Sequence, residues 1–273
     1  MIQFIGCALF LSSNKGMVFS GALALVMAIF QFEYLGFDSD LLEYFSRKMI
    51  FFIPMHLREF LFWWPLFLLR TYLGTYVSYI LIYTLLNSII FRLCHIYEFR
   101  FRDSVIFLVP FAVFGYSNTI RQYFATIIML IIMKYSNKYL PFISGLFHNS
   151  LFLINLMTIR SRISLLIFLF LILFIEPAEL GSANLGGYKF DVLYLFVALF
   201  LSLFISLEKF GLILISYLVL SKYLSFDMIE RVLSNLIFVM LVVMPKKYAV
   251  IRRGVSVCFF SFGLFLESYV RFL

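Results

Sequence analysis

Charged side chains are scarce in this sequence, and their scarcity excludes an ordinary water-soluble domain. Asp, Glu, Lys and Arg make up 13% of the 273 residues, whereas apolar residues make up 64%. Globular proteins average about 25% charged and about 45–50% apolar residues. A soluble fold of this composition would expose large apolar patches, which monomeric proteins avoid. The composition therefore predicts a chain that lies in a lipid bilayer.

The apolar runs also lack the alternation of a membrane β-barrel. Barrel strands alternate apolar and polar residues over about ten positions, whereas Ile163–Ile175 and Val192–Ile205 are continuously apolar. Open sheet edges are not stable in lipid, so helices are the remaining choice. We therefore expect an all-α, polytopic integral membrane protein. It would form a single membrane domain over residues 1–273, with about nine to eleven transmembrane or re-entrant helices.

Histidine and cysteine are too few for a metal centre built from them, since the chain has three of each. Cys7, Cys94 and Cys258 lie in or beside apolar runs without paired spacing, which indicates small hydrophobic residues. The motifs of zinc peptidases, redox CxxC sites, P-loops and α/β-hydrolases are absent. No metal and no cofactor are expected. The N-terminus has no basic region before its first apolar run, so a cleavable signal peptide is not expected.

The longest apolar runs mark the expected helices. A full crossing takes about 20 residues, and several runs are shorter, so some segments must tilt, dip or break. The expected ranges are 2–11, 17–32, 72–91, 104–114, 120–133, 163–175, 192–205, 210–220, 229–244 and 254–270. Trp63 and Trp64 precede the third range and indicate a piece at the headgroup level.

The net charge of +8 is spread over short basic clusters between these runs. Such clusters are typical of cytoplasmic loops and give no reason to expect nucleic acid as a partner. Cytoplasmic loops are therefore expected at Lys15, Arg92–Arg102, Lys134–Lys138, Arg160–Arg162 and Lys246–Arg253. The polar stretches 33–60 and 176–191 should face outward. Both flanks of residues 139–159 are basic, which favours a broken or re-entrant hairpin there over a single crossing.

Ionisable residues inside apolar segments are costly and are candidates for function. They are Arg70, Arg121, His148 and Glu267. Arg121 opens an expected helix, where free N–H groups and a guanidinium could bind a phosphate group; the alternative is a side chain that reaches the lipid headgroups. His148 could carry a proton or donate to a sugar or phosphate oxygen, or it could only pack between helices.

The outward-facing stretch 33–60 offers a further carboxylate. Asp38 lies just beyond an expected span, with Tyr44 nearby, and could act as a general base or bind a sugar hydroxyl. The alternative for Asp38 is a solvated loop carboxylate. Arg58 and Glu59 open the Trp-rich piece, and for them a surface ion pair is the favoured interpretation.

Three of these pieces together resemble a known family. They are Gly36-Phe37-Asp38 followed by Tyr44, Asn118-Thr119-Ile120-Arg121-Gln122, and Leu146-Phe147-His148-Asn149-Ser150. In this order and membrane context they resemble the EpsG-like branch of the Wzy family, the bacterial polymerases of O-antigen and exopolysaccharide. The likeness covers roughly residues 17–175, in which the order and spacing of the motifs and spans agree. The remainder of the chain matches only as further apolar segments.

The resemblance implies an activity and roles for residues. Such enzymes act in the bacterial inner membrane and transfer an undecaprenyl-pyrophosphate-linked glycan chain onto an incoming lipid-linked repeat unit. They build O-antigen of lipopolysaccharide, capsule or exopolysaccharide, and a chain-length regulator is a further candidate partner. Arg121 would hold the leaving pyrophosphate, and Asp38 or His148 would be the base while the other orients the substrate. Asn118, Gln122, Tyr44, Arg58 and Arg70 would complete the substrate site.

Two other classes remain as alternatives. A flippase for the same lipid-linked sugar would be expected to show internal repeats, and none is visible. A membrane acyltransferase that modifies surface sugars would need a His paired with a carboxylate on the cytoplasmic side. The only histidine in the expected cytoplasmic loops is His95, near Glu98 and Arg100.

Overall fold

The computed structural model describes ten stretches of the chain, and all regular secondary structure in them is helical. The stretches are residues 2–13, 16–35, 59–109, 120–135, 140–146, 154, 191–205, 213–214, 217 and 226–272. The α-helices are α1 (Ile2–Ser12), α2 (Met17–Leu35), α5 (Phe60–Ile96), α7 (Ile120–Tyr135), α10 (Asp191–Leu203), α12 (Phe226–Val243) and α13 (Ala249–Phe272). The 3-10 helices are η1 (Phe101–Leu108), η2 (Leu140–Leu146) and η4 (Lys246–Tyr248). This confirms the expected all-α class.

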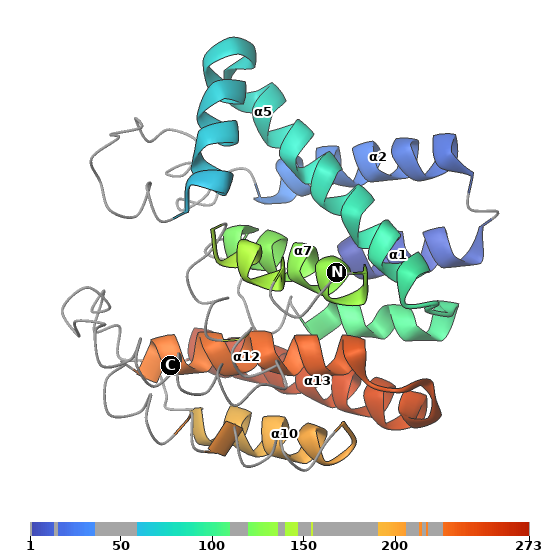
Figure 1. Ribbon diagram of the computed structural model, residues 1–273, viewed down its shortest axis with the longest axis vertical. Helices are drawn as coiled ribbons and strands as arrows, with labels where there is room; N and C mark the ends of the chain where they lie inside the picture. Colours follow the sequence, from blue (N-terminus) through green and yellow to red (C-terminus); the bar gives the residue numbers. More distant parts are fainter. Residues whose placement is uncertain are drawn as a thin grey trace.

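Helix α5 is bent at Gly74, which divides it into two arms (Figure 1). Gly74 has φ 77° and ψ 169°, a conformation that is essentially restricted to glycine. The second arm, residues 75–96, is about 33 Å long at 1.5 Å per residue. That length matches the roughly 30 Å of a bilayer's hydrocarbon core. The Trp-rich piece expected at the headgroup level is therefore the first arm of the same element.

The second arm of α5 crosses a hairpin of α1 and α2 (Figure 1). At its centre the Asn87 side chain donates from Nδ2 to the carbonyl of Ala24 at 3.2 Å and to Oε1 of Gln31 at 3.0 Å. Asn87 is fully buried, so these hydrogen bonds join α5 to α2 in an apolar environment. Gly6 of α1 lies against the Met27 side chain of α2 and leaves no room for a Cβ atom.

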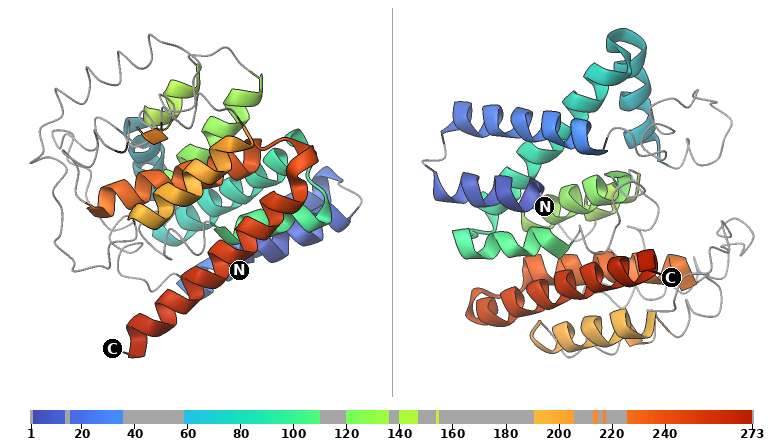
Figure 2. Two further views of the ribbon diagram at one scale, coloured as in Figure 1. Left: turned by 90° about the horizontal axis from the view of Figure 1, so that it is seen from below. Right: turned by 180° about the vertical axis from the view of Figure 1, so that it is seen from behind.

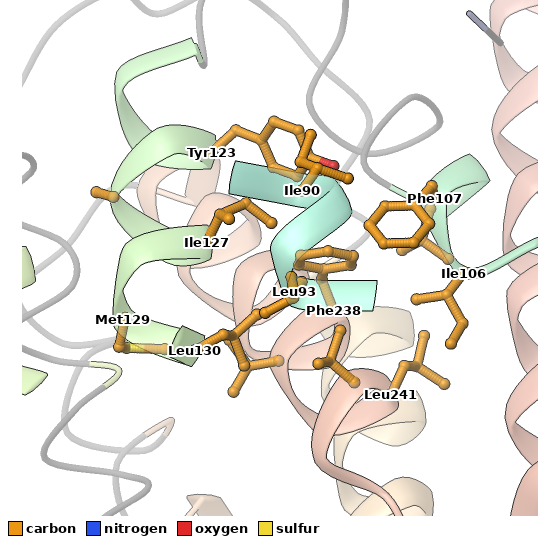
Figure 3. Packing of buried hydrophobic residues seen from close by; sticks show 14 of the residues in the cluster. Ile90, Leu93, Ile106, Phe107, Tyr123, Ile127, Met129, Leu130, Phe238 and Leu241 are labelled. Carbon is orange, nitrogen blue, oxygen red and sulfur yellow. The ribbon is translucent and has the colours of Figure 1, made fainter. Parts of the chain in front are cut away.

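The remaining described helices form the other half of the molecule. Helix α12 packs between α7 and α10, and α13 packs on η1. One apolar core runs through all these helices, and Figure 3 shows the part of it where α5, η1, α7 and α12 meet, with buried side chains that include Leu93, Phe107, Ile127, Phe238 and Leu241. Seen from below, the C-terminal part of α13 extends past the other helices (Figure 2).

Helix α5 ends in a Schellman motif, which turns the chain into η1. The N–H of Phe99 donates to the carbonyl of Cys94 at 2.9 Å, and the N–H of Glu98 donates to the carbonyl of His95 at 3.1 Å. Glu98 has φ 51°, the left-handed conformation that glycine usually provides in this motif. The turn places two acidic residues, Glu98 and Asp103, close to the end of α5.

The helix ends that flank the basic segments gather at one end of the molecule. The end of α1, the start of α2, the α5–η1 turn and the α12–α13 turn all lie on the right in Figure 1 and on the left in the rear view of Figure 2. Helices α12 and α13 meet at 109° across Pro245. The expectation that the basic loops share one side of a membrane stays a prediction, and its segment Arg160–Arg162 lies outside the described residues.

By length and composition, one described helix could cross a membrane, and it is α5. Helices α12 and α13 form a bent pair, which would be a second span if the two helices are counted together as a single crossing. Helices α1, α2, α7 and α10 are apolar but shorter. A membrane location is thus supported by α5 and by the bent pair of α12 and α13.

Most expected segments that lie in the described residues are helices, with one difference; the run 163–175 and most of 210–220 lie outside those residues. The runs 17–32, 120–133, 192–205, 229–244 and 254–270 coincide with α2, α7, α10, α12 and α13. The segment expected at 104–114 begins earlier, as the 3-10 helix η1. Only part of the expected hairpin 139–159 is described, as η2 and Ile154, so the hairpin stays a prediction. The outward-facing stretches 33–60 and 176–191 lie almost wholly outside the described residues.

Candidate functional site

The candidate site starts from the first turn of α7. That helix begins at Ile120, so Arg121 stands where the sequence pattern predicts, among the first N–H groups of a helix. These N–H groups have no partner within the helix and carry a partial positive charge. The Arg121 side chain is not among those described. The side chain of Gln122, the next residue, is 1% exposed.

One turn further along α7, Thr126 joins this helix to α12. The Thr126 hydroxyl donates to the carbonyl of Gln122 at 2.7 Å, and its oxygen lies 3.5 Å from Oδ1 of Asn235. Both Thr126 and Asn235 are fully buried. Tyr123 and Phe238 stand beside them, with ring centroids 5.7 Å apart (Figure 3). The pair is therefore a polar contact inside the apolar core, close below Arg121.

Helices α7 and α12 run in the same direction. Their middles meet at Thr126 and Asn235, and their C-terminal ends both reach the α5–η1 turn. There Lys134 lies over the Tyr97 ring, and Lys246, just beyond α12, pairs with Glu98. The start of α12 thus lies at the same end as Arg121, opposite the basic loops. In a membrane, the start of α7 would face the side away from those loops.

The residue just before the first arm of α5 is a carboxylate whose burial was not expected from the sequence. Glu59 is 3% exposed and accepts a hydrogen bond from the Trp63 indole at 3.3 Å. The expected surface position is therefore wrong for Glu59, whose side chain is buried against Trp63. Its expected partner, Arg58, lies outside the described residues. Trp64, by contrast, is 45% exposed. Arg70 is half-buried on the same arm, two turns beyond Trp63.

The described residues include only some members of the expected site. Arg121 and Gln122 share the first turn of α7, and Arg70 lies on a different element, α5. The other expected members lie outside the part of the chain that the structure describes; they are Asp38, Tyr44, Arg58, Asn118 and His148. In the described stretches no three His, Cys, Asp or Glu side chains converge as metal ligands would.

Two buried amides are polar but not ionisable, so the criterion of ionisable residues in apolar runs does not select them. Asn87 and Asn235 each interrupt a long apolar run, and each makes a contact between helices. An amide in the middle of such a run is costly unless it finds a partner. That signal was present in the sequence and would have found both residues.

The opposite end of the molecule holds the described ion pairs. The Arg252 guanidinium lies 2.8 Å from Oδ1 of Asp103, with both side chains buried. Lys246 pairs with Glu98 on the surface and holds the pKa of that carboxyl below its usual value. Arg253 approaches Asp103 at 3.9 Å. This end is electrostatically organised but far from the start of α7.

Comparison with protein-family models, with curated proteins and with solved structures finds no match for this chain.

Proposed function

We propose that the chain is a multi-span glycan polymerase of the bacterial inner membrane, related to the EpsG-like branch of the Wzy family. It would transfer an undecaprenyl-pyrophosphate-linked glycan chain onto an incoming lipid-linked repeat unit. The observation that carries the proposal is the position of Arg121 in the first turn of α7, within the motif Asn118–Gln122. The order of the three motifs along the chain supports it.

The chemistry suits such a position. A pyrophosphate leaves as an anion, so stabilising its charge matters more than protonating it. Arg121 offers a planar fork of donors, and the helix start adds free N–H groups and a partial positive charge. The acceptor is a sugar hydroxyl, whose proton Asp38 or His148 would remove while the other residue orients the substrate. Residues Asn118, Gln122, Tyr44, Arg58 and Arg70 would bind the rest of the substrate.

The contact between α7 and α12 supports a rigid position for Arg121. Thr126 and Gln122 are buried within the first two turns of α7, and Thr126 meets Asn235 of the parallel helix. A group that stabilises charge is effective when its scaffold is preorganised. Helix α12 lies beyond the segment that carries the resemblance, so it would be a second wall of the site.

A multi-span arrangement is part of the proposal. Helix α2 exposes large apolar side chains along its length, among them Val18, Leu25, Val26, Ile29 and Phe30. Exposed apolar surface of this kind suits contact with lipid chains. The shorter helices α1, α7 and α10 would be tilted or incomplete crossings beside α5.

The acyltransferase alternative loses support at its one candidate pair. The Glu98 carboxylate is paired with Lys246 from the α12–α13 turn, and the charge of His95 has a smaller effect on it than that pair. A flippase for the same lipid-linked sugar remains the useful comparison, because it predicts a different product.

The test is Arg121→Ala in the native host, with surface polysaccharide analysed on a gel. A polymerase defect leaves lipid capped with a single repeat unit and no ladder. Loss of every repeat unit would instead indicate a flippase, and a normal ladder would refute the role of Arg121. Arg121→Lys should also abolish the ladder if the guanidinium binds phosphate through two donors.

Arg92→Ala is the matched control. Arg92 is exposed near the far end of α5, so its loss should leave the ladder unchanged. Immunoblots of membranes must show equal amounts of all variants, which separates lost activity from lost protein.

A further inference from the structure

The turn after α5 is surrounded by basic side chains from three other places in the chain. Lys134 of α7 lies 5.6 Å from the centroid of the Tyr97 ring. Lys246 pairs with Glu98, and Arg252 lies 5.0 Å from the centroid of the Phe99 ring. Three consecutive residues of the turn, Tyr97 to Phe99, thus each contact a different cation. One of these cations comes from α7 and two come from the α12–α13 region.

Both carboxylates at this end already have cationic partners. Glu98 is paired with Lys246, and Asp103 is paired with the buried Arg252 at 2.8 Å. Five further cations are exposed and make no ion pair with any carboxylate of the described stretches. Arg92 lies on α5 before the turn, and the other four follow the turn or come from the elements beside it; they are Arg100, Arg102, Lys134 and Lys247. These four residues form the basic end surface. Its charge is not neutralised from within the described protein.

Exposed apolar side chains are interleaved with these cations. Phe101, between Arg100 and Arg102, is 54% exposed, and Tyr135, next to Lys134, is 65% exposed. Val250, at the start of α13, is 76% exposed. Cations beside exposed aromatic and apolar groups suit the boundary between headgroups and acyl chains. A nucleic acid or an acidic protein in water would explain the cations but not the exposed apolar residues.

We infer that the basic end surface binds acidic phospholipid headgroups of the membrane leaflet it faces. The four cations would pair with lipid phosphates, while Phe101 and Tyr135 enter the adjacent acyl region. Basic residues beside a membrane surface favour anionic lipids, and the attraction falls off within a Debye length. The inference rests on the protein being in a bilayer, and it does not depend on the polymerase proposal.

The experiment uses the full chain in nanodiscs of phosphatidylcholine that contain phosphatidylglycerol as the acidic probe. After transfer to detergent, native mass spectrometry counts the lipids of each kind that stay bound. We expect phosphatidylglycerol to be retained in preference to phosphatidylcholine, with less retention at high salt. The triple variant Arg100→Gln, Arg102→Gln and Lys247→Gln should lose the preference, at about fivefold in affinity for each charge removed.

Two further variants keep the test decisive. Lys247→Gln alone changes one exposed residue and should give a partial loss, even if the triple variant unfolds. Glu98→Gln removes an acidic group from the same end and should strengthen retention of phosphatidylglycerol. Equal retention of both lipids by the wild type, an unchanged preference in the variants, or complete displacement by millimolar inorganic phosphate would overturn the inference. The last result would indicate a site for free anions.

Discussion

At the scale of single residues, the pair of Arg252 and Asp103 is the most consequential described interaction. Both side chains are buried, and Asp103 also accepts the backbone N–H of Arg100 at 3.0 Å. The guanidinium approaches Oδ1 at 2.8 Å without the alignment of a hydrogen bond, and its Nε donor has no partner in the described protein. A buried pair of this kind contributes little net stability, yet removing one partner is costly.

Arg252→Ala should therefore destabilise the protein by about 3–5 kcal/mol, because it removes the nearer counter-charge of the buried Asp103 carboxylate and leaves only Arg253 at 3.9 Å. The double variant Arg252→Met and Asp103→Leu removes both charges at similar volume and should recover most of that loss. Equilibrium unfolding in mixed micelles, followed by circular dichroism, measures the differences. A double variant as unstable as Arg252→Ala would show that the buried charge is not the cause.

Glu98 illustrates a local compromise. It holds the left-handed position of the Schellman motif, which strains a residue with a Cβ atom. Glu98→Gly should relieve this strain and raise the unfolding midpoint by about 2–4 °C, although it removes the exposed pair with Lys246. Glu98→Ala is the control, since it removes the same pair and keeps the strain. If both variants shift the midpoint equally, the backbone conformation has no role.

At the scale of elements, long apolar runs predicted helices well. Runs such as 120–133 and 229–244 have no competing structure that would satisfy their backbone in lipid, so α7 and α12 followed directly from them. The bend of α5 was less visible. A glycine inside an apolar run is compatible with a continuous helix, and only the contacts made by each arm decide whether it bends. From the sequence, residues 72–91 are consequently expected as a helix separate from the Trp-rich piece, with a boundary two residues before the observed bend.

Gly74→Ala tests the bend directly. A Cβ atom at this position meets nothing within 4 Å, but the φ of 77° is unfavourable for alanine. We expect a loss of about 1–3 kcal/mol, or a straightened α5. Gly21→Ala in α2 is a matched control with equally open space and helical backbone, and it should be neutral or stabilising. Spin labels at exposed positions on the two arms would report straightening as a longer distance between them.

At the scale of the whole molecule, two of the basic segments that the sequence grouped lie together in the structure, but the sequence did not predict which residues meet. The charge pattern grouped Arg92–Arg102 with Lys246–Arg253, and the structure brings the ends of both together through Glu98 and Asp103. No spacing rule could predict the contact of Thr126 with Asn235, which are 109 residues apart. The catalytic assignment of Asp38 and His148 still rests on sequence motifs alone.

The shared end gives a prediction for membrane topology. Arg102 and Lys247 are both exposed there, so cysteines placed at the two positions should always be labelled together, from one side of the membrane. Because basic loops favour the cytoplasm, a membrane-impermeant maleimide should label neither in intact cells and both after permeabilisation. The background must carry Cys258→Ser, since Cys258 is exposed whereas Cys7 and Cys94 are buried.

Two outcomes of the labelling experiment would contradict different claims. Labelling of one position but not the other in intact cells would contradict the packing of the α12–α13 turn on η1. Labelling of both positions in intact cells would agree with that packing but would show that the protein has the opposite orientation in the membrane. Arg121 would then face the cytoplasm, where a polymerase of the proposed kind does not act. An inverted protein would therefore exclude the polymerase proposal while leaving the acidic-lipid surface to be tested on the other leaflet.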